Sequence, residues 1–176
     1  MTNRVLDAAA GVASRELLEP LPPDGQLWIF GSSRGLSESE AEELLQAVDG
    51  FLEGWKAHGY PLAARRAWLH GHFLLVGADP RVAAPSGCSI DALVRTLKEV
   101  ENRLGVELVG KGRVWYRDRD GEIRAVSRSE FRARAGEGFV TPETPVFDLS
   151  PSRVSEVRQG WEAPARERWH GSAFFS

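Results

Sequence analysis

Residues 63–78 read AARRAWLHGHFLLVGA, and this stretch decides the fold that the sequence predicts. Its two halves, 63–69 and 73–78, are short runs that we predict to be strands. Gly71 lies between them and can adopt the positive φ that a tight hairpin needs. The stretch therefore predicts two paired strands, and the segments on either side determine what kind of sheet they join.

A strand and an amphipathic helix come before this hairpin. Residues 26–33, QLWIFGSS, have the bulky, strand-favouring content of a buried strand. Ser37 and Glu40 form a capping box, in which the hydroxyl and the carboxylate each accept a hydrogen bond from a backbone N–H. Apolar residues then recur at every third or fourth position: Ala41, Leu44, Leu45, Val48, Leu52 and Trp55. We predict a helix that starts after Ser37 and stops at Gly59.

A second amphipathic helix and another strand follow the hairpin. The apolar positions of this helix are Ile90, Leu93, Val94, Leu97, Val100 and Leu104. Gly105 ends the pattern, and residues 106–118, VELVGKGRVWYRD, supply the strand. The order strand, helix, strand, strand, helix, strand is that of the ferredoxin-like split βαβ fold, an α+β class. We therefore predict, over residues 25–118, an antiparallel sheet with both helices on one face, preceded by a helix and linker in residues 1–24.

The rest of the chain predicts a small β-rich extension with an aromatic tail. Residues 117–127 form a hairpin that turns at an Asp-Gly pair, and Ser127 or Ser129 caps a short helix after it. Residues 141–149 are predicted as an edge strand, because their two prolines cannot donate to a ladder. We expect the aromatic residues of 151–176 to pack back onto the body of the protein.

The segment VWYRDRDGEIRAVSRSEFRARAGEGFVTPETPVFD resembles the GYF-like modules of bacterial proteins, over residues 113–150. The matching residues are Trp115, Tyr116, Gly121, Phe131, Gly138, Val140, Thr144, Val146 and Phe147, with Trp161 as a later aromatic. Relatives of these modules grip proline-rich peptides with aromatic residues. Here Ala125-Val126 replace the Gly-Pro that precedes the serine, so the resemblance predicts the shape of the module rather than its ligand.

A second resemblance covers most of residues 26–170, through LWIFGSSR, FLEGWKAHG, HFLLVGAD, SGCSIDALV, VWYRD, VFD and WH. These motifs resemble a bacterial family of short uncharacterised proteins often labelled ABC transporter ATPase. The resemblance implies a shared fold and brings no activity with it. An ATPase needs the run G-x-x-x-x-G-K-[ST] to wrap phosphates, and the chain contains no such run. We therefore expect neither an ATPase nor a bound cofactor.

Composition and charge narrow the class of partner. The chain has 176 residues, is 42% hydrophobic, and carries a formal net charge of −3. This charge does not favour nucleic acid or an anionic membrane, and no apolar run approaches the roughly twenty residues of a transmembrane helix. One cysteine excludes an internal disulfide framework and a multi-cysteine metal site. We expect a cytoplasmic protein.

Three further kinds of binding site are not favoured by the sequence. Aromatic residues that alternate along the predicted sheet would bind RNA if its face were open, but burial is preferred: Trp28, Phe30, Trp68 and Trp115. His70 and His72 flank a glycine, yet no third metal ligand is fixed by spacing. The turn FGSSRGLS lacks the third glycine and the Tyr-x-x-x-Lys pair of a dinucleotide site, although Ser32, Ser33 and Arg34 remain candidates for one anionic group.

Cys88 in PSGCSID admits two interpretations. As a nucleophile at a helix N-terminus, it would be favoured as the thiolate, with His72 or His58 as base. The residues around such a site would be Ser86, Gly87, Ser89, and Asp91 or Asp79. As a structural residue, it would precede an N-cap at Ser89 and pack on Leu93 as a hydrophobic staple. We favour the staple.

The function predicted from the sequence is a binding or regulatory module for a protein or a small ligand. We expect its site at the sheet face or around the two loops that hold Arg34 and Cys88, which would share a pocket if both emerge at one end of the sheet. One alternative is a thiol-dependent hydrolase or transferase that uses Cys88. The other is a homodimer formed through the sheet face.

Overall fold

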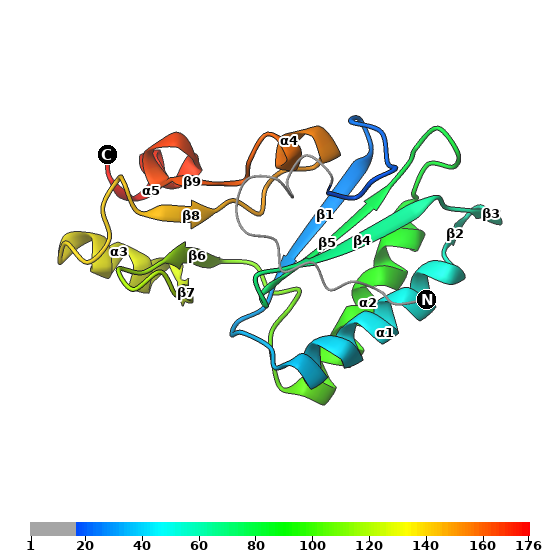
Figure 1. The fold of residues 1–176 in the computed structure, drawn as a ribbon, viewed down its shortest axis with the longest axis horizontal. Helices are drawn as coiled ribbons and strands as arrows, with labels where there is room; N and C mark the ends of the chain where they lie inside the picture. Colours follow the sequence, from blue (N-terminus) through cyan, green and yellow to red (C-terminus); the bar gives the residue numbers. More distant parts are fainter. Residues whose placement is uncertain (1–16) are drawn as a thin grey trace.

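The computed structural model describes residues 17–176, which form an α+β protein with antiparallel sheets and five α-helices (Figure 1). The helix predicted near the N-terminus falls on residues outside this range, apart from residues 17–20, which form a turn. In the described part of the chain, no helix combines the length and the apolar character needed to cross a membrane.

The first sheet has three antiparallel strands in the order β1-β5-β4. Their bounds are β1 (Gln26–Gly31), β4 (Ala64–Leu69) and β5 (Phe73–Ala78). The predicted hairpin is confirmed, since β4 and β5 pair around His70 and Gly71, which have φ of 55° and 64°. Because β1 and β4 are both antiparallel to β5, they run in the same direction with β5 between them. Strands β1 and β4, with α1 between them in the chain, thus flank a strand of opposite direction.

Both predicted helices cover one face of this sheet (Figure 1). They are α1 (Glu38–Glu53) and α2 (Gly87–Leu104), and their apolar stripes pack on Leu74 and Val76 of β5. The predicted capping box of α1 is present. However, α1 ends five residues earlier than expected, because Gly59, with a φ of 82°, turns a short arm instead. The two strands of this arm are β2 (Lys56–Ala57) and β3 (Tyr60–Pro61).

The predicted fourth strand of the ferredoxin-like sheet does not join it. Residues 113–117 form β6 (Arg113–Arg117), which pairs with other strands in a second sheet of order β7-β6-β8-β9. Its partners are β7 (Ile123–Ser127), β8 (Pro145–Phe147) and β9 (Glu162–Pro164). The predicted edge strand is also wrong, because β8 lies between β6 and β9. The free edge of β1 is instead contacted by residues 152–153. Leu27 N–H donates a hydrogen bond to Ser152 C=O, and Gln26 and Arg153 form an isolated β-bridge.

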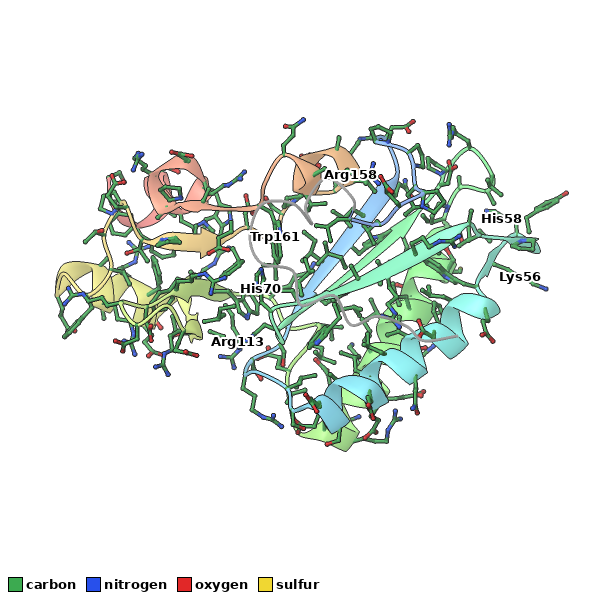
Figure 2. The ribbon with its side chains drawn as sticks, viewed as in Figure 1. Lys56, His58, His70, Arg113, Arg158 and Trp161 are labelled. Atoms are coloured by element: carbon green, nitrogen blue, oxygen red, sulfur yellow. The ribbon has the colours of Figure 1, made fainter. Side chains whose placement is uncertain are left out.

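The face of the first sheet opposite the helices is buried under the C-terminal half of the chain. Phe73 and Leu75 of β5 are fully buried there against Trp115 and Phe147 of the second sheet and Trp161, which Figure 2 labels between the two sheets. Helix α4 (Val154–Arg158) completes this layer. The sheet face is therefore not open to RNA or to a second copy. The candidate aromatics are divided, with Trp28, Phe30 and Trp68 on the helix side and Trp115 on the other.

The second sheet carries its own core. Helix α3 (Arg128–Gly136) is capped by the Ser127 hydroxyl, as predicted, and buries Phe131 against Tyr116 of β6. The tail adds a 3-10 turn, η1 (Ala165–Glu167), and α5 (Trp169–Phe174), whose aromatic side chains pack against the same cluster.

We predict that Gly31→Ala destabilises the protein by about 1–3 kcal/mol, because it overpacks the junction of the two sheets. A Cβ at Gly31 would lie 2.5 Å from the Trp115 ring, whose Nε1 donates to Ser32 C=O and cannot easily move. The measurement is urea denaturation. Gly50→Ala is the matched control, because a Cβ there meets nothing within 4 Å in the exposed interior of α1. It should raise stability by up to about 1 kcal/mol. Equal effects of the two substitutions would contradict this account of the junction.

Candidate functional site

The loop that holds Cys88 is a helix cap, but it differs from the predicted one. Ser86 is the N-cap of α2, and the capping box joins it to Ser89: Ser89 N–H donates to the Ser86 hydroxyl, and Ser86 N–H donates to the Ser89 hydroxyl at 2.7 Å. Cys88 therefore lies inside the first turn and is exposed, so the predicted staple with Leu93 is wrong. Ser89 C=O also accepts a hydrogen bond from the Trp55 indole, which ties the start of α2 to the end of α1. The motif SGCSID thus has a clear structural role.

Among residues 17–176, no hydrogen bond pairs Cys88 with a histidine. His72 lies at the other end of α2, because its ring approaches Gly35, next to Arg34, and Arg34 donates to Leu104 C=O at the last turn of that helix. Eighteen helical residues span roughly 25 Å. His58 is exposed on the β2–β3 arm, and no described hydrogen bond joins it to Cys88 (Figure 2). Gly87 and Asp91 are both exposed around the thiol.

The shared pocket expected for Arg34 and Cys88 is also wrong, for a topological reason. Because β1 and β5 are antiparallel, the end of β1 pairs with the start of β5: Gly31 is opposite Phe73, and Gln26 is opposite Ala78. The loops that follow the two strands therefore leave from opposite ends of the sheet.

The Ser32–Arg34 turn is engaged by the protein itself. Both terminal nitrogens of Arg34 bond the carboxylate of Glu40, and this bond is the main reason that the pKa of Glu40 falls to about 2. The Ser33 hydroxyl accepts from Glu107 N–H, and Ser33 N–H donates to Glu107 C=O. Ser32 is fully buried, with its backbone bonded to His72 and to Trp115. The turn therefore ties β1 to α1, α2 and β6 rather than presenting donors to an anion.

His72 contributes to the same junction. Its Nδ1 lies 2.9 Å from His70 C=O, and burial lowers the pKa of its imidazole below the ordinary value. Within residues 17–176, no three His, Cys, Asp or Glu side chains are grouped so that they could hold a metal ion.

A hollow of about 150 Å³ lies in the C-terminal half, between the β6–β7 turn and the end of α3. Its lining residues are Tyr116, Asp118, Arg119, Asp120, Arg134 and Phe139. The turn that forms one wall is rigid, because Asp118 Oδ1 accepts from the backbone N–H groups of Asp120 and Glu122, and Asp118 Oδ2 accepts from Arg124 at 2.6 Å. The Arg124 bond also lowers the pKa of the Asp118 carboxyl.

The opposite wall of the hollow is formed where α3 ends. Gly138 adopts a φ of 77°, its C=O accepts from Arg119, and the next residue, Phe139, is 58% exposed. The floor is Tyr116, which is only 3% exposed and whose phenol pKa is raised by burial. Among the described residues, the Tyr116 hydroxyl and the Asp120 carboxylate have no side-chain hydrogen-bond partner. The hollow thus combines an exposed ring with polar groups that are not satisfied internally.

Sequence reasoning did not identify this hollow as a site. It named Tyr116, Gly121 and Gly138 only as positions that match GYF-like modules. The signal that was available is Gly138-Phe139, an aromatic residue directly after a glycine that ends a polar helix, where no apolar pattern accounts for the ring.

Comparison of the chain with protein families, with curated protein sequences and with solved structures gives no significant match. The two resemblances noted from the sequence therefore remain predictions.

We predict that Cys88 reacts with a mild alkylating reagent at nearly the same rate in the native protein and in urea, because its side chain is exposed. Cys88→Ser should change the free energy of unfolding by less than about 0.5 kcal/mol. Ser86→Ala, two residues away, should cost about 1 kcal/mol, because it removes the N-cap. Native labelling much faster than in urea would revive the nucleophile hypothesis.

Proposed function

We propose that the protein is a binding module for another protein, and that the interaction surface centres on the hollow floored by Tyr116. The size of the hollow carries this proposal. Sites for small free ligands usually enclose roughly 300–1,000 Å³, whereas this hollow measures about 150 Å³. A volume of this size accommodates one side chain, which a protein or peptide partner can supply together with contacts around the rim.

The composition of the rim supports the same proposal. Tyrosine and arginine are enriched among the residues that dominate protein–protein binding energy, and both types line the hollow. Phe139 offers an exposed apolar face at the rim. The Tyr116 hydroxyl and the exposed Asp120 carboxylate are not bonded to any described side chain, so a partner side chain can be selected by polarity as well as by size.

The resemblance to GYF-like modules is a further ground. The hairpin, the Ser127-capped helix and the strand at residues 145–147 follow one another as that resemblance requires. We infer a module of this kind supported by a split βαβ unit. Because Ala125-Val126 stand in place of the family's Gly-Pro, the resemblance does not specify which peptides bind. Selection from a peptide library can identify them.

We predict that peptides selected by phage display against the full-length protein depend on Phe139. Phe139→Ser should weaken the binding of a selected peptide at least 10-fold, since it removes the exposed ring at the rim, as measured by fluorescence anisotropy. Tyr60→Ser is the matched control, because Tyr60 is 69% exposed but lies on the β2–β3 arm. It should leave the affinity unchanged.

Chemical-shift changes on adding the peptide should map to the lining residues of the hollow. The proposal fails if selected peptides bind equally well to Phe139→Ser, or if their shifts map to the Cys88 loop or the β2–β3 arm. It also fails if selection yields no peptide that binds the folded protein.

A further inference from the structure

His170 holds α5 onto the second sheet in an unusual way. Its side chain is 1% exposed, and its Nδ1 is buried without a hydrogen-bond partner among the described residues. The ring stacks on Trp169 with centroids 3.9 Å apart and lies 6.5 Å from the rings of Phe131 and Phe174. A polar ring packed this way is stable in the apolar cluster only while it is neutral.

Charged groups of both signs lie around this helix. From α3, the Arg128 guanidinium lies 4.8 Å from the centre of the Trp169 ring, and Arg132 lies over Phe174 and donates to Ala173 C=O. Arg168 directly precedes α5, and its Nε is buried and unpartnered. Asp148, after β8, supplies the opposing carboxylate, but its Oδ1 already accepts from the Ser150 hydroxyl and N–H. Burial lowers the pKa of the His170 imidazole most, the Asp148 carboxylate raises it, and Arg128 and Arg168 lower it.

The same helix supports the floor of the hollow through a short chain of rings. Phe131 of α3 packs against His170 on one side and against Tyr116 on the other, with the Phe131 and Tyr116 centroids 5.4 Å apart at an interplanar angle of 71°. Tyr116 then forms the floor. If α5 moved away, Phe131 would lose the packing that holds Tyr116 in place.

We propose that α5 is an acid-released latch, and that its closed position keeps the hollow in its binding shape. The coupling to binding rests on the function proposed above, whereas the latch itself does not. Release is a local change, because α5 has only six residues.

The direction and size of the effect follow from the two states of His170. Burial is the main cause that lowers its pKa from the ordinary 6.5 to about 4, with Asp148 acting in the opposite sense. The unlatched imidazole binds a proton more readily than the latched one, so the latch is fully stable above pH 6.5 and weakens as the pH falls toward 4. At pH 5, the closing equilibrium should be about 20-fold weaker than at pH 7.

The test is amide hydrogen exchange on the full-length protein without any ligand, corrected for the intrinsic pH dependence of exchange. Between pH 7 and pH 5, protection factors in α5 should fall about 20-fold, and at both pH values α5 should be less protected than β5, which reports global unfolding. His170→Leu should abolish this fall, because leucine fills a similar volume and does not titrate. His58→Gln, which alters an exposed histidine on the β2–β3 arm, should preserve it.

Three results would overturn the latch: equal protection factors in α5 and β5, the same pH-dependent fall in His170→Leu, or a His170 ring that titrates near 6.5 in the folded protein by NMR. The last measurement needs no variant. A selected peptide should also bind more weakly at pH 5 than at pH 7 in the wild type, but not in His170→Leu. If α5 opens and peptide affinity stays constant, the coupling is wrong while the latch stands; if no peptide binds at either pH, the proposed function fails alone.

Discussion

Strand β5 is buried on both faces, and the rest of the structure depends on that constraint. All six of its residues are buried, with Leu74 and Val76 against the helices and Phe73 and Leu75 against the C-terminal half. A strand of this kind needs a layer on each side. Helices α1 and α2 provide one layer, and the other is provided mainly by residues more than thirty positions further along the chain, with Leu17, Leu18 and Leu21 from before β1. Packing on this strand therefore contributes to joining the two sheets.

This constraint also explains why the ferredoxin-like sheet is not completed. In that fold, a fourth strand extends the sheet and one face has no helices. Here β6, the strand that follows α2, lies instead against the sheet face opposite the helices. Trp115 of β6 packs there against Phe73 and donates its indole N–H to Ser32 C=O. The segment before β6 is held in place by Glu101, whose carboxylate accepts hydrogen bonds from the backbone N–H groups of Leu108 and Val109. These bonds set the direction in which the chain leaves α2 toward the second sheet.

The local elements were predictable because their signals are local. The Ser37–Glu40 box, the His70-Gly71 turn and the Ser127 cap all lie within four residues of the groups they satisfy. The sheet that β6 joins was not predictable in the same way, because the sequence of a short apolar strand does not specify which strand it pairs with. One clue was present: FLLVGA lacks the polar alternation of a strand with one open face.

The candidate site was predicted less well, and the reasons are specific. PSGCSID contains two serines that can act as the N-cap. An N-cap at Ser89 would place Cys88 in a buried position before the helix, whereas the observed N-cap at Ser86 places it in the first turn. Placing Arg34 beside Cys88 overlooked that antiparallel neighbours send their following loops to opposite ends. The hollow had no motif, because it is assembled from a turn, a helix end and a strand that meet only in the fold.

The polar groups of the turn after β1 are mostly bonded within the protein. Arg34 is bonded to Glu40 and Ser33 to Glu107, although the buried Ser32 hydroxyl and the Gln26 side-chain oxygen have no partner among the described residues. In the C-terminal half, the His170 Nδ1 and the Arg168 Nε are buried without partners. Buried polar groups are ordinarily satisfied because leaving them unsatisfied costs about 1–3 kcal/mol each. Unsatisfied atoms therefore occur in both halves, and the C-terminal half is distinguished by the exposed ring of Phe139 beside the hollow floored by Tyr116.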